Sequence, residues 1–146
     1  MKKYIYLDHA ATTATRPEVV EAMLPYFTEN FGNASSVYEL GSRNKEVLNK
    51  SRETIAAALG ADATEIYFTA GGSESDNWAL KATAEAYEKK GRHIITTKIE
   101  HHAILHSAKA LEREGFDVTV LPVDADGVVA PEAVEAAIRP DTVLVS

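Results

Sequence analysis

The sequence predicts an α/β protein, built from a mainly parallel sheet with helices on both of its faces. Short β-prone apolar segments alternate along the chain with longer segments of helical periodicity. Helical segments of this length provide the crossover connections that parallel strands require. The hydrophobic content of 45% in 146 residues is enough for a sizeable core. We therefore expect three layers, with the sheet between two layers of helices.

The first part of the chain is predicted to be mostly helical. A short strand over 4–7 is followed by a helix over 17–27, which has a proline in its first turn. Residues 31–36 include several turn formers and predict a loop. A long amphipathic helix follows over 38–59, and Gly60 ends it.

The rest of the chain is predicted to alternate strand and helix. Short apolar segments predict four strands, over 65–69, 93–97, 117–121 and 142–145. Helical periodicity predicts three helices between them, over 73–90, 103–114 and 131–138. The last strand has the composition of a buried strand, and no closing helix follows it. We therefore expect the chain to be the front part of a longer protein.

The composition excludes several classes of partner. A net charge of −7 is unfavourable for binding nucleic acid or an anionic membrane surface, so neither is expected. No apolar run approaches the length of a membrane span, and the N-terminus lacks the pattern of a signal peptide. A soluble, cytoplasmic protein is expected. Because the chain contains no cysteine, it can form no disulfide and supply no thiolate.

The glycine-rich segment Phe68-Thr-Ala-Gly-Gly-Ser-Glu-Ser-Asp-Asn-Trp78 is the most informative part of the chain. Its two glycines allow a sharp bend between a strand and a helix. Ser73 is expected to be the N-cap of that helix, with Asp76 as its capping-box partner. Free amides and a hydroxyl at the positive end of a helix suit a phosphate group. On spacing alone, a well-capped turn without a ligand is the simpler interpretation.

Five motifs in register resemble the N-terminal part of cysteine desulfurases of the NifS/IscS type. These are pyridoxal-phosphate enzymes of the class V aminotransferase family, with the fold-type I architecture. The resemblance covers the whole chain, and its loop at 31–36 favours the NifS/IscS branch over the SufS branch. The motifs are Tyr6-Leu-Asp-His-Ala-Ala-Thr-Thr13, Phe31-Gly-Asn-Ala-Ser-Ser36, Phe68-Thr-Ala-Gly-Gly-Ser-Glu-Ser-Asp-Asn77, Glu100-His101 and Leu121-Pro-Val-Asp-Ala-Asp-Gly127.

The resemblance implies a division of the chain and a role for three residues. Residues 1–15 would be an N-terminal segment, and 16–146 the first part of the cofactor-binding large domain, ending before the cofactor lysine. Gly72 and Ser73 stand where the family usually has Ala-Thr, the pair that binds the cofactor phosphate. His101 stands where the family has the histidine that stacks on the pyridine ring and assists proton transfers. Without the resemblance, we would interpret His101 as a residue that only caps a helix.

Two loops of the first part of the chain are implied to lie near the substrate entrance. They contain Ala11 and Thr12 in one case and Asn33 in the other. Ala34 replaces a proline that is common in the family.

His102 and His106 suggest a rival site. A spacing of four places both histidines on one face of a helix, as in a zinc-binding pair. The chain has no cysteine and no evident third ligand. We therefore expect two surface histidines and no metal.

The resemblance implies a concrete reaction. L-Cysteine would be converted to L-alanine, and its sulfur would pass to a cysteine of the enzyme as a persulfide. The sulfur would then serve iron–sulfur cluster assembly through an acceptor or scaffold protein, and the full-length enzyme would be a homodimer. The cofactor lysine, the aspartate that pairs with the pyridine nitrogen and the persulfide cysteine are expected beyond residue 146. The chain alone is therefore expected to be inactive.

Two alternatives differ from this prediction. One is a selenocysteine lyase, or another class V enzyme acting on a different amino acid. The other is a non-catalytic binding or assembly fragment that pairs with a partner chain.

Overall fold

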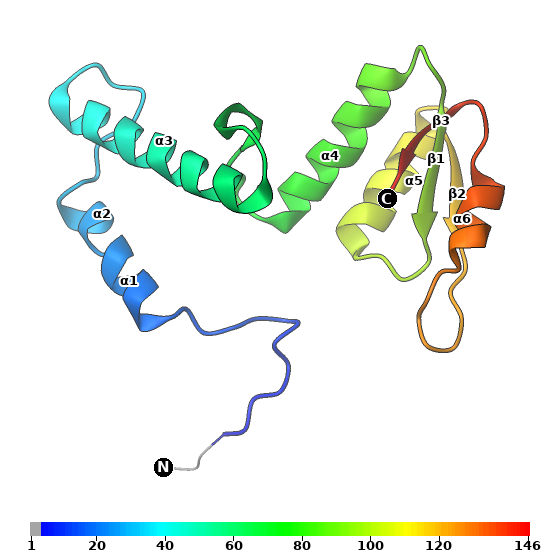
Figure 1. The fold of residues 1–146 in the computed structure, drawn as a ribbon, viewed down its shortest axis with the longest axis horizontal. Helices are drawn as coiled ribbons and strands as arrows, with labels where there is room; N and C mark the ends of the chain where they lie inside the picture. Colours follow the sequence, from blue (N-terminus) through cyan, green and yellow to red (C-terminus); the bar gives the residue numbers. More distant parts are fainter. Residues whose placement is uncertain (1–3) are drawn as a thin grey trace. The chain divides into compact units, whose positions relative to one another are not determined.

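The computed structural model describes residues 4–146, and the chain divides into two compact units. The first unit extends to Tyr67, and the second extends from Phe68 to Ser146 (Figure 1). The predicted division of the sequence after residue 15 stays a prediction.

The first unit contains short helices followed by one long helix. Helix α1 spans Pro17–Met23, α2 spans Pro25–Thr28, and α3 spans Glu39–Leu59. The single helix predicted over 17–27 is therefore wrong in detail. Pro25 has no amide hydrogen to donate, so it ends one helix and occupies the first turn of the next.

The long helix α3 confirms the prediction for this part of the chain. It has 21 residues, and Tyr38 is its N-cap. Gly60 follows with a φ of 68°, in the left-handed region that glycine adopts without steric cost. Its amide donates to the Ala56 carbonyl and closes the last turn.

The second unit contains the sheet and the helices that pack on it. Its elements, in chain order, are α4 (Gly72–Tyr87), β1 (His93–Thr97), α5 (His102–Arg113), β2 (Asp117–Leu121), α6 (Pro131–Ala137) and β3 (Thr142–Val145). The sheet has the order β2-β1-β3, and both strand pairs are parallel. The strands predicted over 93–97, 117–121 and 142–145 are confirmed.

The connections place helices on both faces of this sheet. The chain moves from β1 to β2 in one direction and from β2 back across to β3 in the other. Because such crossovers are right-handed, α5 and α6 lie on opposite faces. Figure 1 shows these two helices on either side of the strands. The predicted α/β class and its parallel sheet are confirmed.

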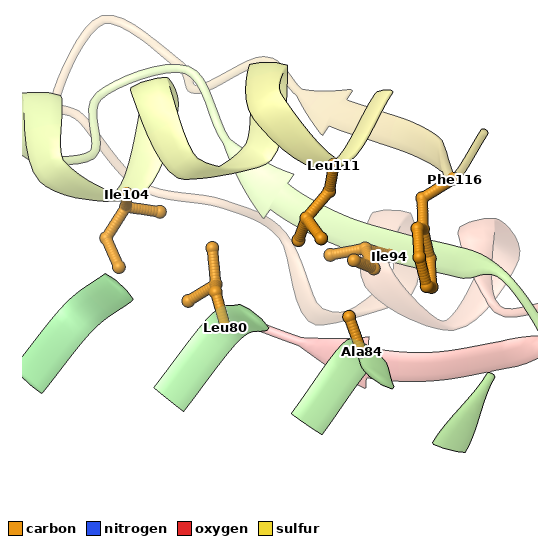
Figure 2. Packing of buried hydrophobic residues seen from close by; sticks show 6 residues of the cluster. All are labelled: Leu80, Ala84, Ile94, Ile104, Leu111 and Phe116. Carbon is orange, nitrogen blue, oxygen red and sulfur yellow. The ribbon is translucent and has the colours of Figure 1, made fainter. Parts of the chain in front are cut away.

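The core of the second unit lies between β1 and the helices α4 and α5. Ile94 is fully buried at its centre, with an exposed fraction of 0%. Helix α4 and helix α5 approach it from one face of the sheet (Figure 2). The residues of this cluster are Leu80, Ala84, Ile94, Ile104, Leu111 and Phe116.

Two predicted strands are wrong. Residues 4–7 form no strand, and residues 63–65 form a 3₁₀ helix, η1 (Ala63–Glu65), in place of the start of a strand. The Asp62 amide donates to the Glu65 carboxylate at 2.8 Å, which favours this short helix. Ile66 is extended, but the segment up to Thr69 does not join the sheet. Apolar β-prone residues become a strand only where a neighbouring strand pairs with them.

Within residues 4–146, none of the helices combines the length and apolarity that a membrane span needs.

Candidate functional site

The glycine turn, residues 69–75, starts helix α4 in a different way from the one predicted. Gly71 is the N-cap and Gly72 is the first helical residue, so Ser73 lies inside the first turn. The Gly71 carbonyl accepts the amides of Glu74 at 3.1 Å and Ser75 at 3.2 Å. The predicted capping box of Ser73 with Asp76 is therefore wrong. A glycine N-cap has no side chain that could accept a hydrogen bond, so other polar groups of the turn make the stabilising hydrogen bonds.

Side chains on both sides of the two glycines hold the turn. The Glu74 carboxylate accepts the Ala70 amide at 2.6 Å. The Thr69 hydroxyl donates to the Gly71 carbonyl at 3.2 Å and lies 2.7 Å from the Ser75 hydroxyl. These contacts fix the backbone before and after the bend.

The backbone amides within the bend are available to donate hydrogen bonds. Within the described part of the chain, the amides of Gly72 and Ser73 have no hydrogen-bond acceptor. A Cβ placed on Gly71 or Gly72 would meet no atom within 4 Å, so the space in front of the turn is open. These amides lie at the positive end of a helix of 16 residues, and Ser73 is exposed. This donor set fits a phosphate dianion.

His101 lies at the start of the next helix. It is the N-cap of α5, and its Nδ1 accepts the Ala103 amide at 3.1 Å. The structure thus displays the capping role that we would assign without the family resemblance. An acceptor at Nδ1 places the proton of the neutral imidazole on Nε2. His101 is exposed, and a contact to a bound ring stays a prediction.

Glu100 supports the loop that carries His101. Its Oε1 accepts a hydrogen bond from the Thr97 hydroxyl at 3.0 Å, across the end of β1. Glu100 was predicted only as part of a motif, without a role of its own. A carboxylate three residues after a strand threonine was the signal that could have identified this contact.

The two helix starts lie at the same end of the second unit. Helix α5 begins just after β1 ends, and the N-terminus of α4 lies at the end toward which the β1 arrow points (Figure 1). In open α/β sheets, ligands bind outside the carboxyl ends of the strands. Gly72, Ser73 and His101 therefore belong to one end of the sheet, the end where such proteins bind ligands.

The other predicted site residues belong to the first unit. The amides of Ala11 and Thr12 both turn back toward the Asp8 carbonyl, at 3.1 and 3.4 Å. The Asn33 side chain accepts the Ser35 amide at 2.9 Å and shapes the loop before α3. Their substrate-binding role stays a prediction.

The His102 and His106 rings stack on the surface of α5. Their centroids are 5.6 Å apart and their planes differ by 29°. Among residues 4–146, they form no group with a third histidine, cysteine, aspartate or glutamate that could hold a metal ion. A structural zinc site needs four ligands.

The parallel sheet with helices on both faces defines an α/β protein, and the open glycine turn lies at the carboxyl end of its strands (Figure 1). The chain belongs to the class V aminotransferase family, which matches residues 5–146. Members of this family are pyridoxal-phosphate enzymes, and the predicted resemblance to its NifS/IscS branch is confirmed.

Individual relatives agree along the whole chain. It is 59% identical over 146 residues to a cysteine desulfurase IscS from Clostridium botulinum (strain Kyoto / Type A2), covering 100% of this chain and 37% of the relative. It is 58% identical over 144 residues to the cysteine desulfurase IscS of Methanosarcina thermophila, covering 99% of this chain and 36% of that protein. The chain thus spans little more than a third of the length of these relatives.

Solved structures share the fold. A NifS-like protein superposes with a TM-score of 0.91 at 42% identity, covering 97% of this chain and 39% of the other. SspA in complex with cysteine gives a TM-score of 0.89 at 40% identity, covering 96% of this chain and 40% of SspA. The fold class is that of the pyridoxal-phosphate enzymes of fold type I, represented here by part of the large domain.

Proposed function

We propose that this chain supplies the phosphate-binding turn and the ring-facing histidine of a pyridoxal-phosphate-dependent cysteine desulfurase. The observation that carries the proposal is the 59% identity to a cysteine desulfurase over all 146 residues. The open donor set of the glycine turn supports it, because it suits the phosphate of the cofactor. The reaction converts L-cysteine to L-alanine and transfers the sulfur to an enzyme cysteine.

Each site residue has a defined task in this proposal. The amides of Gly72 and Ser73 and the Ser73 hydroxyl bind the phosphate and so orient the cofactor. The cofactor, when bound, supplies an electron sink for the reacting amino acid. His101 presents Nε2, because Nδ1 is held by the Ala103 amide, and it exchanges a proton through that atom. Ala11, Thr12 and Asn33 contribute to the substrate entrance.

The proposal extends to domains, partners and location. Residues 1–15 form the N-terminal segment, and 16–146 form the first part of the large domain. L-Cysteine is the substrate, and the complex of the structurally similar SspA with cysteine supports this choice. We also propose that the full-length protein is a cytoplasmic homodimer and that it passes its sulfur to an acceptor or scaffold protein. These proposals rest on the family resemblance and the sequence.

The 146-residue chain alone is proposed to be inactive. It contains no cysteine, so it has no group that could accept the sulfur as a persulfide. The lysine that holds the cofactor and the aspartate that pairs with its ring nitrogen are expected elsewhere in the protein. Incubation of the chain with the cofactor and L-cysteine should therefore release no alanine above the background of free cofactor.

The decisive experiment uses the protein expressed from its complete gene. We expect it to bind pyridoxal phosphate and to release alanine from L-cysteine. Replacement of Ser73 by alanine should weaken cofactor binding about tenfold, because a hydrogen bond to the phosphate charge is lost. The matched control is Ser51→Ala, since the Ser51 hydroxyl donates only to the Val47 carbonyl on α3.

Two results would contradict the proposal. One is a complete protein that binds no pyridoxal phosphate. The other is a complete protein that binds it but forms no alanine from L-cysteine, and selenocysteine tested in parallel would then identify a selenocysteine lyase.

A further inference from the structure

Glu74 is placed where a carboxylate would be expected to oppose phosphate binding. It lies in the first turn of α4, directly after Ser73, on the exposed side of the glycine turn. A negative side chain near a bound dianion raises the energy of the complex through like-charge repulsion. A second interaction must therefore explain why a glutamate fits this position.

The structure provides that interaction. The Glu74 carboxylate turns back and accepts the Ala70 amide at 2.6 Å, which is a short hydrogen bond. In an ordinary capping box, the side chain at this position returns to the N-cap amide. Here Gly71 is the N-cap, and the Glu74 side chain returns one residue further back, to the Ala70 amide. The amide of Ala70 is thereby removed from the group of donors that face the open space.

This hydrogen bond also fixes the direction of the remaining donors. Ala70 lies on one side of the two glycines and Glu74 on the other, so their contact sets the width of the bend. The hydroxyl pair of Thr69 and Ser75 spans the same bend at 2.7 Å. Gly71 and Gly72 have no side chain to limit their backbone, and a loose turn would have to become ordered whenever a ligand binds.

We propose that Glu74 is a positioning residue of the phosphate site, which acts through the Ala70 amide and not through its charge. This inference rests on the proposed function, since it concerns the same site. It predicts that a neutral acceptor can replace the carboxylate, whereas a side chain without an acceptor cannot. Removal of the charge by itself should not weaken phosphate binding.

The experiment compares three variants of the protein expressed from its complete gene. Glu74→Gln keeps an oxygen that can accept the Ala70 amide, and Glu74→Ala removes it. Asp76→Asn is the matched control, because it removes a carboxylate from the same part of α4. Within the described residues, the Asp76 side chain has no hydrogen bond. Pyridoxal-phosphate affinity and hydrogen exchange in peptides that contain the Ala70 amide are measured for each variant.

We expect Glu74→Ala to weaken cofactor binding about five- to tenfold and to accelerate exchange at Ala70. Glu74→Gln and Asp76→Asn should bind within about twofold of the wild type, and Glu74→Gln should keep Ala70 protected. The inference is overturned if Glu74→Ala binds as the wild type does, or if Glu74→Gln is as weak as Glu74→Ala.

The two proposals can fail separately. A wild-type protein that binds no cofactor contradicts the proposed function, but exchange at Ala70 still reports whether Glu74 holds the turn. Fast exchange at Ala70 in the wild type contradicts the role of Glu74 even if the cofactor binds. Circular dichroism of each variant establishes that the helices are retained. If Glu74→Ala loses them, Glu74→Leu takes its place, because leucine also lacks an acceptor and favours a helix.

Discussion

His93 Nε2 lies 2.8 Å from the Thr119 hydroxyl, so the central strand of the sheet is joined to β2 through a side chain as well as through the backbone. On the other side, His93 Nδ1 lies 2.7 Å from the Thr142 hydroxyl on β3. The imidazole is fully buried, with an exposed fraction of 0%. One histidine therefore links all three strands, at the opposite end of β1 from the candidate site.

Replacement of His93 by alanine should destabilise the second unit by about 3 kcal/mol, because a cavity forms, the Thr119 hydroxyl loses its partner, and the Thr142 hydroxyl keeps only the Arg139 amide. Urea unfolding followed by the fluorescence of the single Trp78 measures this change. Thr119→Val removes only one of the two contacts and should cost about 1 kcal/mol. A loss below about 1 kcal/mol for His93→Ala would show that the threonines do not depend on it.

Thr96 offers a contrasting case on the same strand. Its side chain is fully buried, and within the described residues its hydroxyl has no hydrogen-bond partner. Thr96→Val replaces that hydroxyl by a methyl group and should stabilise the unit by about 1 kcal/mol in the same urea assay. Thr97→Val is the matched control, because it breaks the bond to Glu100 and should destabilise by a similar amount. Destabilisation by Thr96→Val would indicate a partner for its hydroxyl, such as a buried water.

The parts of the fold that were predicted correctly are those fixed by local pattern. The strand over 93–97 is short, β-prone and followed by a helix, and it has partners on both sides. The segment at 65–69 has the same local pattern but no place in this sheet. Strand pairing depends on segments far apart in the sequence, which explains why residues 4–7 were also predicted wrongly.

Only part of the candidate site was predicted correctly, because local sequence determines some of its features and not others. The glycines of the turn and its opening into a helix follow from local sequence, and the structure confirms that bend. The cap was assigned to Ser73 because serine is a common N-cap, whereas Gly71 carries no side-chain signal. The return of Glu74 to Ala70 follows only from the actual start of the helix, one or two residues earlier than expected.

Asp141 should make stability depend on pH below its ordinary pKa. Arg139 donates two hydrogen bonds to its carboxylate, at 3.0 and 2.8 Å, and these lower the pKa of Asp141 from 3.8. A lowered pKa in the folded state means that the contribution is complete above the unfolded value and is lost as the pH falls through the folded value. Asp141→Asn should therefore reduce the loss of stability on acidification below about pH 4.

The measurement is a series of urea unfolding curves between neutral pH and acid. The control is Asp126→Asn, in the exposed turn 124–127. Because Asp141 is exposed to solvent, salt should weaken the effect. Equal acid sensitivity of the wild type and Asp141→Asn would contradict this prediction.

The last prediction concerns the proton on His101. Because Nδ1 accepts the Ala103 amide, the neutral imidazole should carry its proton on Nε2. Nitrogen-15 NMR distinguishes the two tautomers directly. His106, which stacks on His102 and caps no helix, serves as the control. A dominant proton on Nδ1 would exclude this hydrogen bond and with it the choice of Nε2 for proton exchange with the substrate.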